Sequence, residues 1–171
     1  GMPKGVAISH QGAVNTILDI NRRFEINQED CILALSSLSF DLSVYDIFGT
    51  LAAGGAIVIP NADANKDAVE WRKLIKRHQI TVWNSVPALM EMLIEDGIDH
   101  ADNHSLRLVM LSGEWINLGL RDRIINNYPQ AKVISLGGAT EASIWSIFYP
   151  IENVDKSWKS IPYGRPLANL Y

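Results

Sequence analysis

Short apolar runs along this chain alternate with segments whose apolar residues recur at helical spacing. The runs are rich in Ile, Val and Leu and almost unbroken, which is typical of strands buried on both faces. This alternation predicts a parallel sheet covered by helices. The predicted strands are residues 31–36, 56–59, 81–84, 106–112 and 132–136, and the predicted helices are about 12–24, 44–53, 67–78, 87–96 and 118–127.

The fold class that follows is α/β, a three-layer, mostly parallel, doubly wound sheet with helices on both faces. Turn and cap residues support the helix positions. Ser43 with Asp46 suggests a capping box, Pro87 suits a first helical turn, and Gly97 suits a helix end. Beyond Glu141 the pattern changes and predicts a strand over 142–149, followed by a polar loop through 159.

Composition excludes some classes of protein but does not indicate a reaction. With 171 residues, 47% hydrophobic, 20% charged and a net charge of −4, the chain has no basic field for nucleic acid or anionic membranes. No apolar run is long enough to span a bilayer, and no export signal opens the chain. The single cysteine, Cys31, lies in an apolar run and is expected to be a structural thiol. It fits a reducing compartment, so we expect a cytoplasmic protein.

The two ends indicate an excised segment. Gly1 and Met2 are typical of an expression remnant, and Pro3-Lys4-Gly5 begins abruptly in a loop. We therefore expect residues 1–171 to form a single α/β lobe cut from a longer domain.

Polar and glycine-rich segments follow several of the predicted strands. They are Phe40-Asp41, Asn84-Ser85, Ser112–Glu114 and Gly137–Glu141. Open parallel sheets bind ligands beyond the carboxyl ends of their strands, so these segments are expected to meet in one crevice. Asn61 also follows a strand, which means that position alone does not identify a site.

Two of these segments carry candidate chemistry. Asp41 is suited to anchoring an ammonium group, although position alone favours a helix N-cap. Thr140 and Glu141 offer a hydroxyl for a phosphate and a carboxylate for Mg²⁺, and the adjacent glycines allow close approach of a ligand. Thr140 and Glu141 could equally begin a turn.

The remaining candidates are weak. Lys4 could end a phosphate-binding loop, but most such lysines are solvated. The histidines lack metal-ligand spacing, and no Gly-x-Ser-x-Gly elbow is present. Trp83, Trp115 and Trp145 suit a core or a pocket wall.

The order of the motifs is more specific than any single one. Pro-Lys-Gly-Val, Phe-Asp-Leu-Ser-Val-Tyr-Asp-Ile-Phe, Leu-Ser-Gly-Glu, Gly-Gly-Ala-Thr-Glu and Gly-Arg-Pro-Leu-Ala-Asn follow one another along essentially the whole chain. This series resembles the adenylation domain of nonribosomal peptide synthetases, in the adenylate-forming superfamily. The resemblance implies that ATP and an amino acid give aminoacyl-AMP and pyrophosphate, with transfer to a carrier-protein phosphopantetheine thiol.

The resemblance also implies a role for each matching residue. Asp41 would pair with the substrate ammonium group, Thr140 would meet the α-phosphate, and Glu141 would hold Mg²⁺. Catalytic roles thus fall to Thr140, Glu141 and Lys4. Nucleotide contacts fall to Gly5, Gly113, Glu114, Gly137, Gly138, Ala139 and Thr140. In the family motif a tyrosine and a proline usually stand where this chain has Gly137 and Ala139, so the aromatic contact to adenine would come from elsewhere.

The family's side-chain pocket maps onto Asp41, Leu42, Tyr45, Asn84, Met110, Ser112, Leu136, Ile144 and Trp145. This set is similar to the signature for cysteine, with Met110 where leucine is more usual, a change that nearly conserves volume. Serine would be hard to reject, because apolar pockets exclude an isosteric hydroxyl poorly. Cysteine-selective domains of this type commonly belong to siderophore synthetases.

Several alternatives stay open. An acyl-CoA synthetase would share Thr140 and Glu141 but need no carboxylate for an ammonium group. A Rossmann dehydrogenase is disfavoured because no Gly-x-Gly-x-x-Gly follows the first strand. A catalytically silent lobe would keep the fold alone. The resemblance further implies a ribose-binding aspartate beyond Tyr171 and a lysine on a C-terminal lid, so we expect the segment alone to be inactive.

Overall fold

The structure is a computed structural model that describes residues 5–61, 66–95 and 105–169. Seven strands form one sheet in the order β2-β1-β3-β4-β5-β6-β7. The first five run parallel, whereas β6 and β7 are antiparallel additions at one edge. The strands are β1 (Cys31–Leu33), β2 (Ala56–Val58), β3 (Val82–Ser85), β4 (Leu108–Leu111), β5 (Lys132–Gly137), β6 (Ile147–Pro150) and β7 (Arg165–Pro166).

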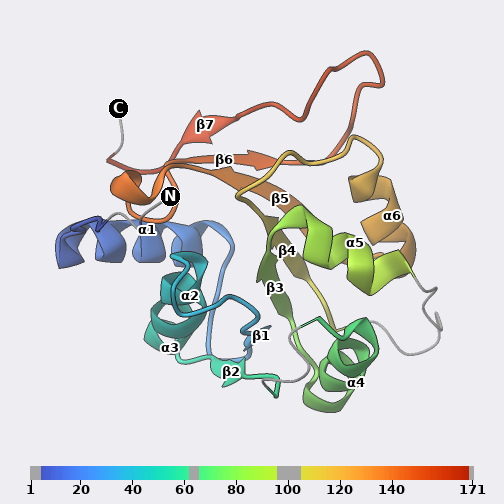
Figure 1. Cartoon of the computed structure of the whole chain (residues 1–171), viewed down its shortest axis with the longest axis horizontal. Coiled ribbons are helices and arrows are strands. Elements are labelled where there is room, and N and C mark those ends of the chain that lie inside the picture. The colour runs from blue at the N-terminus through green and yellow to red at the C-terminus, as the bar shows by residue number, and fades with distance from the viewer. Residues whose placement is uncertain (1–4, 62–65, 96–104, 170–171) are drawn as a thin grey trace.

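Helices cover both faces of the sheet (Figure 1). One face carries α1 (His10–Arg23) and a continuous helical stretch made of α2 (Leu42–Val44), the π-helical turn η1 (Tyr45–Gly49) and α3 (Thr50–Ala52). The other face carries α4 (Ala68–His78), α5 (Pro87–Glu95) and α6 (Leu120–Asn127).

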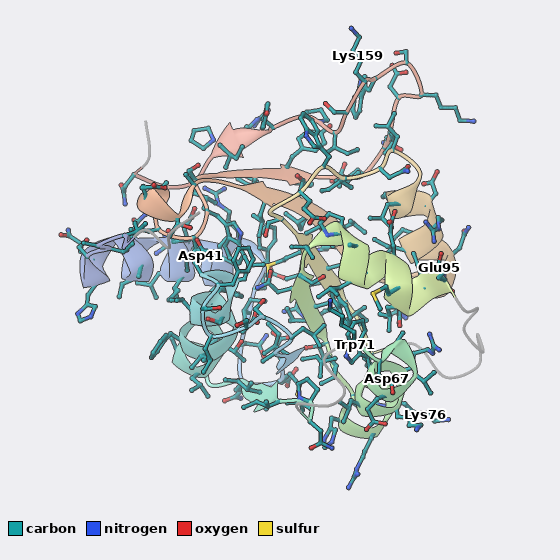
Figure 2. The ribbon with its side chains drawn as sticks, in the orientation of Figure 1. Asp41, Asp67, Trp71, Lys76, Glu95 and Lys159 are labelled. Carbon is teal, nitrogen blue, oxygen red and sulfur yellow. The ribbon has the colours of Figure 1, made fainter. Side chains whose placement is uncertain are left out.

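Alternation along the central strands divides the interior into two cores. Trp83 and Val109 face α4–α6 and pack with Trp71, which Figure 2 labels on α4. Met110 and Leu136 face α1 and η1. The sheet is therefore the middle of three layers, as the sequence pattern predicts.

Most predicted elements are confirmed, and the differences have local causes. All five predicted parallel strands form, and the predicted helix over 44–53 begins two residues earlier, at Leu42. The capping box is wrong: Ser43 Oγ donates to the Phe40 carbonyl, and Asp46 accepts from Asn84 instead. Gly97 lies outside the described residues.

The predicted strand over 142–149 is wrong in its first half. Ser143 and Ile144 both adopt left-handed backbone, with φ of 65° and 73°, so β6 begins only at Ile147. A short 3-10 turn, η3 (Thr140–Ala142), precedes them. The polar loop then returns to form β7, which the sequence did not predict.

Cys31 is half-buried, and burial raises the pKa of its thiol, consistent with a structural role. Across the described ranges, no helix is both long and apolar enough to cross a membrane.

Candidate functional site

The structure brings Asp41 and Thr140 into direct contact, although they lie on distant parts of the chain. The Thr140 hydroxyl donates to Asp41 Oδ2 over 2.6 Å. Asp41 stands at the N-cap position of α2 but makes no side-chain capping hydrogen bond. Figure 2 shows it beside α1 and α2, apart from Trp71 on α4. The capping role that position alone favours is therefore not the role of its carboxylate.

Thr140 and Glu141 form the exposed turn η3 directly after β5. The turn is followed by strained backbone, because left-handed φ values are rare for a β-branched residue such as Ile144. The Thr16 hydroxyl on α1 donates to the Ser143 carbonyl over 2.9 Å and helps to hold this conformation. Strain of this kind, of order 1–3 kcal/mol per residue, clusters at ligand-binding sites.

A hollow of about 310 Å³ opens beyond the ends of β4 and β5. This volume is at the lower end of the range for small-molecule sites. Position 138 must be a glycine, because a Cβ on Gly138 would come within 2.6 Å of the Ser146 nitrogen. The hollow is lined by Gly113, Glu114, Trp115, Ile116, Ser135, Leu136, Gly137, Gly138, Ile147, Ile161, Pro162 and Tyr163.

Two aromatic rings on the rim of this hollow face solvent. Trp115 is 72% exposed and Tyr163 is 74% exposed, with ring centroids 6.3 Å apart. Exposed rings beside a hollow offer stacking surfaces for a flat ligand. The sequence suggested that Trp115 lines a pocket or core and gave no role to Tyr163. The departure at Gly137 is the one signal that pointed to an aromatic group elsewhere.

The predicted side-chain pocket residues gather on the α1–η1 face of the sheet. Asn84 pairs in register with Met110, and Ser112 follows on the same face. Tyr45 and Trp145 close the cluster, with ring centroids 5.1 Å apart. Except for Asp41, which is half-buried, every member is at most 5% exposed; these members are Leu42, Tyr45, Asn84, Met110, Ser112, Leu136, Ile144 and Trp145.

Unpaired polar atoms remain inside this cluster. Asn84 Oδ1, Ser112 Oγ and Trp145 Nε1 are buried and have no hydrogen-bond partner among the described residues. The Asn84 amide nitrogen donates to Asp46, which the sequence assigned only to a capping box. Burial raises the pKa of Asp46 to about 7, and hydrogen bonding by Asn84 and Ser36 offsets this only in part. Native interiors rarely leave such atoms unpaired, so the cluster has the polarity of a ligand site.

The other predicted site residues are exposed or lie outside the described residues. Gly5 is exposed and does not line the hollow, and Lys4 lies outside the described residues. Ala139 and Glu141 are exposed beside Thr140. Within the described part of the chain, no group of three or more His, Cys, Asp or Glu side chains could hold a metal ion by itself.

Comparison with known proteins gives close relatives over nearly the whole chain. The chain is 53% identical to bacitracin synthase 1 of Bacillus licheniformis, over 99% of its own length and 3% of that protein. It is 52% identical to the anguibactin system regulator of Vibrio anguillarum, over 98% of its length and 16% of that protein. The chain thus spans a small part of each relative.

Solved structures agree in fold. The nonribosomal peptide synthetase FmoA3, in its form bound to α-methyl-L-serine-AMP, matches with a TM-score of 0.93 and 44% identity, over 98% of this chain and 19% of that one. An AMPPNP-bound form of the same protein matches with a TM-score of 0.92.

The sequence profile of the AMP-binding enzymes matches residues 1–171, the full length of the chain. The relatives and the shared fold agree with that match. This chain belongs to the AMP-binding enzyme family.

Proposed function

We propose that this chain is a lobe of an adenylation domain of a nonribosomal peptide synthetase, which joins an amino acid to AMP at the expense of ATP. The observation that carries the proposal is the 2.6 Å hydrogen bond between Thr140 and Asp41. A group suited to an ammonium ion and a group suited to a phosphate meet at one point. Adenylation needs this arrangement, because the amino-acid carboxylate must reach the α-phosphate of ATP.

Each reacting group has a counterpart among these residues. Asp41 would hold the α-ammonium group through a charge-assisted hydrogen bond, which fixes the carboxylate of the same substrate. That carboxylate oxygen would form a bond to the α-phosphorus, and pyrophosphate would leave. The Thr140 hydroxyl would donate to an α-phosphate oxygen, where negative charge grows in the transition state.

The residues around η3 fit a nucleotide and its metal. The hollow has room for a flat base, glycine backbone on one wall and aromatic rings on its rim. Glu141 is an exposed carboxylate beside Thr140, an oxygen donor of the kind that Mg²⁺ takes together with phosphates. When bound, Mg²⁺ would neutralise phosphate charge. Lys4 is proposed as a further phosphate contact.

The substrate we propose is L-cysteine. Tyr45 and Trp145 would close a short apolar pocket, in keeping with a small side chain. The unpaired Asn84 and Ser112 oxygens add polarity suited to a side chain that ends in a hydrogen-bond donor. The same features suit a hydroxyl, and FmoA3 binds α-methyl-L-serine-AMP. Serine is therefore the competing substrate to test.

The partner we propose is a carrier-protein domain, whose phosphopantetheine thiol would receive the aminoacyl group. We further propose that residues 1–171 alone bind cysteine and ATP weakly and turn over neither. Robust cysteine-dependent pyrophosphate exchange by this segment alone would contradict that expectation.

The decisive variant is Asp41→Ala in the complete enzyme, assayed by exchange of pyrophosphate into ATP. With cysteine we expect a loss of about 100-fold or more, because the ammonium group loses its charged partner. The loss with 3-mercaptopropionate, which lacks the amino group, would be much smaller. Glu152→Ala, which removes an exposed carboxylate away from η3, is the matched control.

Other outcomes would favour the alternative functions. Equal losses with both acids, or faster reaction of the deaminated acid with the unchanged enzyme, would indicate an acyl-CoA synthetase. A silent lobe would show no saturable heat when the complete domain is titrated with a cysteinyl-adenylate analogue.

A further inference from the structure

Asp46 is a buried carboxylate to which the sequence assigned only a capping box, which the structure does not form, and to which the proposed reaction gives no role. It lies on the π-helical turn η1 and is 0% exposed. Its Oδ1 accepts a hydrogen bond of 2.7 Å from the side-chain nitrogen of Asn84. Asn84 is also 0% exposed and belongs to the predicted side-chain pocket. A π-helical turn within an α-helix is often found at a functional site.

An ionised carboxylate can only accept hydrogen bonds. It therefore requires the Asn84 amide to direct its nitrogen toward Asp46. The carbonyl oxygen of the same amide must then point away from Asp46. That oxygen is buried and has no hydrogen-bond partner among the described residues. Leaving such an acceptor unpaired costs stability, unless a ligand supplies a donor.

The surroundings of Asn84 show which ligand group could supply it. Met110 is its register partner on β4, and Ser112 continues along the same face. Ser112 Oγ is likewise buried and without a partner among the described residues. The Tyr45 hydroxyl does not compete, because it donates to Asn21. The unpaired oxygens thus lie where the proposed pocket would receive a substrate side chain.

We propose that Asp46 is a positioning residue for substrate selection: it fixes the Asn84 amide so that its carbonyl oxygen accepts a hydrogen bond from the substrate side chain. The inference rests on the proposed function and narrows it. The substrate class becomes amino acids whose side chain ends in a donor, a thiol or a hydroxyl. An apolar isostere of the same size is bound less well, since it leaves the acceptor unpaired.

A purely structural role for Asp46 predicts a different result. Such a role would tie η1 to β3, and substitution would change stability and every substrate alike. Positioning predicts a change confined to substrates that carry a donor. The comparison of L-cysteine with L-2-aminobutyrate separates the two roles, because a methyl group there replaces the thiol.

Asp46→Asn is the first variant, assayed by pyrophosphate exchange in the complete enzyme at about pH 8.5, above the pKa of Asp46. An amide can donate as well as accept, so Asn84 is no longer held in one orientation. We expect the ratio of kcat/KM for cysteine to that for aminobutyrate to fall about threefold. The lower ratio is expected to come from a higher KM for cysteine, with kcat little changed.

Asp46→Leu removes the acceptor altogether, and we expect the same ratio to fall by about tenfold. Turnover of aminobutyrate by the same protein reports whether this variant folds. If it does not fold, the near-isosteric Asp46→Asn carries the test. Asp30→Asn is the matched control, because Asp30 is equally a buried aspartate but lies at the opposite end of the strands. Its ratio is expected to stay at the wild-type value.

A ratio within 1.5-fold of wild type in every Asp46 variant that folds would overturn the inference, as would equal losses for cysteine and aminobutyrate. If the proposed function itself is wrong, the exchange assay gives a different result. The wild-type enzyme would then show no exchange that depends on any amino acid, and the inference would fall with it.

Discussion

The two ends of the parallel strands differ in how fully a buried carboxylate is hydrogen-bonded. At the amino end, Asp30 precedes β1 and accepts from Arg107 over 2.8 and 2.6 Å, from Thr81 over 2.7 Å and from the Asn27 backbone over 3.0 Å. At the carboxyl end, Asp46 accepts one hydrogen bond of ordinary geometry among the described residues, from Asn84. Ser36 lies near enough to affect its pKa, but Asp46 Oδ2 has no hydrogen bond of ordinary geometry.

The pKa values follow this difference. Burial raises the pKa of Asp30, but the hydrogen bonds from Arg107, Thr81 and Asn27 outweigh it and hold the value below normal. For Asp46 burial dominates and raises the pKa to about 7. A fully paired network stabilises the fold, whereas an incompletely paired one costs stability and keeps groups available for a ligand. The contrast separates a fully paired polar cluster from the one for which we propose a function.

Breaking the amino-end network gives the largest expected effect. Asp30→Asn leaves the Arg107 guanidinium without its anion, and we expect the intact domain to lose about 2–3 kcal/mol of unfolding free energy in urea. Arg107 is one-third exposed, which limits the loss. Asp122→Ala breaks an exposed ion pair with Arg121 and should cost less than about 0.5 kcal/mol. A loss for Asp30→Asn no larger than for this control would remove the contrast.

The carboxyl end should respond with the opposite sign. Asp46→Asn removes a buried charge, so at about pH 8 we expect the domain to gain of order 1–2 kcal/mol. Below about pH 3 the gain should vanish, since Asp46 is then protonated in both the folded and the unfolded state. Urea unfolding across this range measures the change. Destabilisation at pH 8 would show that the charge is better paired than the contacts indicate.

The pH dependence of stability distinguishes the two aspartates directly. The lowered pKa of Asp30 gives a contribution that is present above the ordinary value of 3.8 and lost as the pH falls through the folded-state pKa. The raised pKa of Asp46 gives the reverse: its contribution is present below 3.8 and lost as the pH rises to about 7. Asp46→Asn should flatten the decline between these values, and Asp30→Asn should leave it.

At the hollow, Trp115→Ala should weaken ATP binding. Loss of one stacking surface corresponds to about 1 kcal/mol, or roughly a fivefold rise in the KM for ATP. Trp158→Ala is the matched control, because its ring packs on Tyr149 and does not line the hollow. If both variants raise the KM for ATP equally, the exposed rings do not bind the base.

The smallest effect is expected at the strained turn after η3. Thr16→Val removes the hydroxyl that donates to the Ser143 carbonyl, at a cost of about 1 kcal/mol. Because Ile144 follows in left-handed backbone, the KM for cysteine should rise about twofold to threefold. An unchanged KM, with stability reduced, would confine Thr16 to a structural role.

The sequence predicted the sheet well because its strands are buried on both faces and therefore almost continuously apolar. It failed between Ser143 and Ser146, where two consecutive left-handed residues interrupt an apolar, β-branched run. Local propensity favours a strand there, whereas the observed turn is held by several contacts, among them the hydrogen bonds from Thr16 to the Ser143 carbonyl and from the Ser146 nitrogen to the Gly137 carbonyl. The edge strand β7 has only two residues and depends on pairing with β6, so its own sequence carries little signal.

The sequence likewise predicted only part of the candidate site. Motif order led to Asp41 and Thr140, and the structure brings them together. Motif order could not identify the contact between Asp46 and Asn84, since nothing in the local sequence marks which face of η1 meets β3. Tyr163 was missed because its part in the hollow depends on the return of a long loop.

The most direct test of the account is a crystal structure of the complete enzyme with a cysteinyl-adenylate analogue. We expect the ammonium group within about 3 Å of the Asp41 carboxylate, and a phosphate oxygen within hydrogen-bond distance of the Thr140 hydroxyl. An ammonium group held elsewhere, with Asp41 facing solvent, would contradict it.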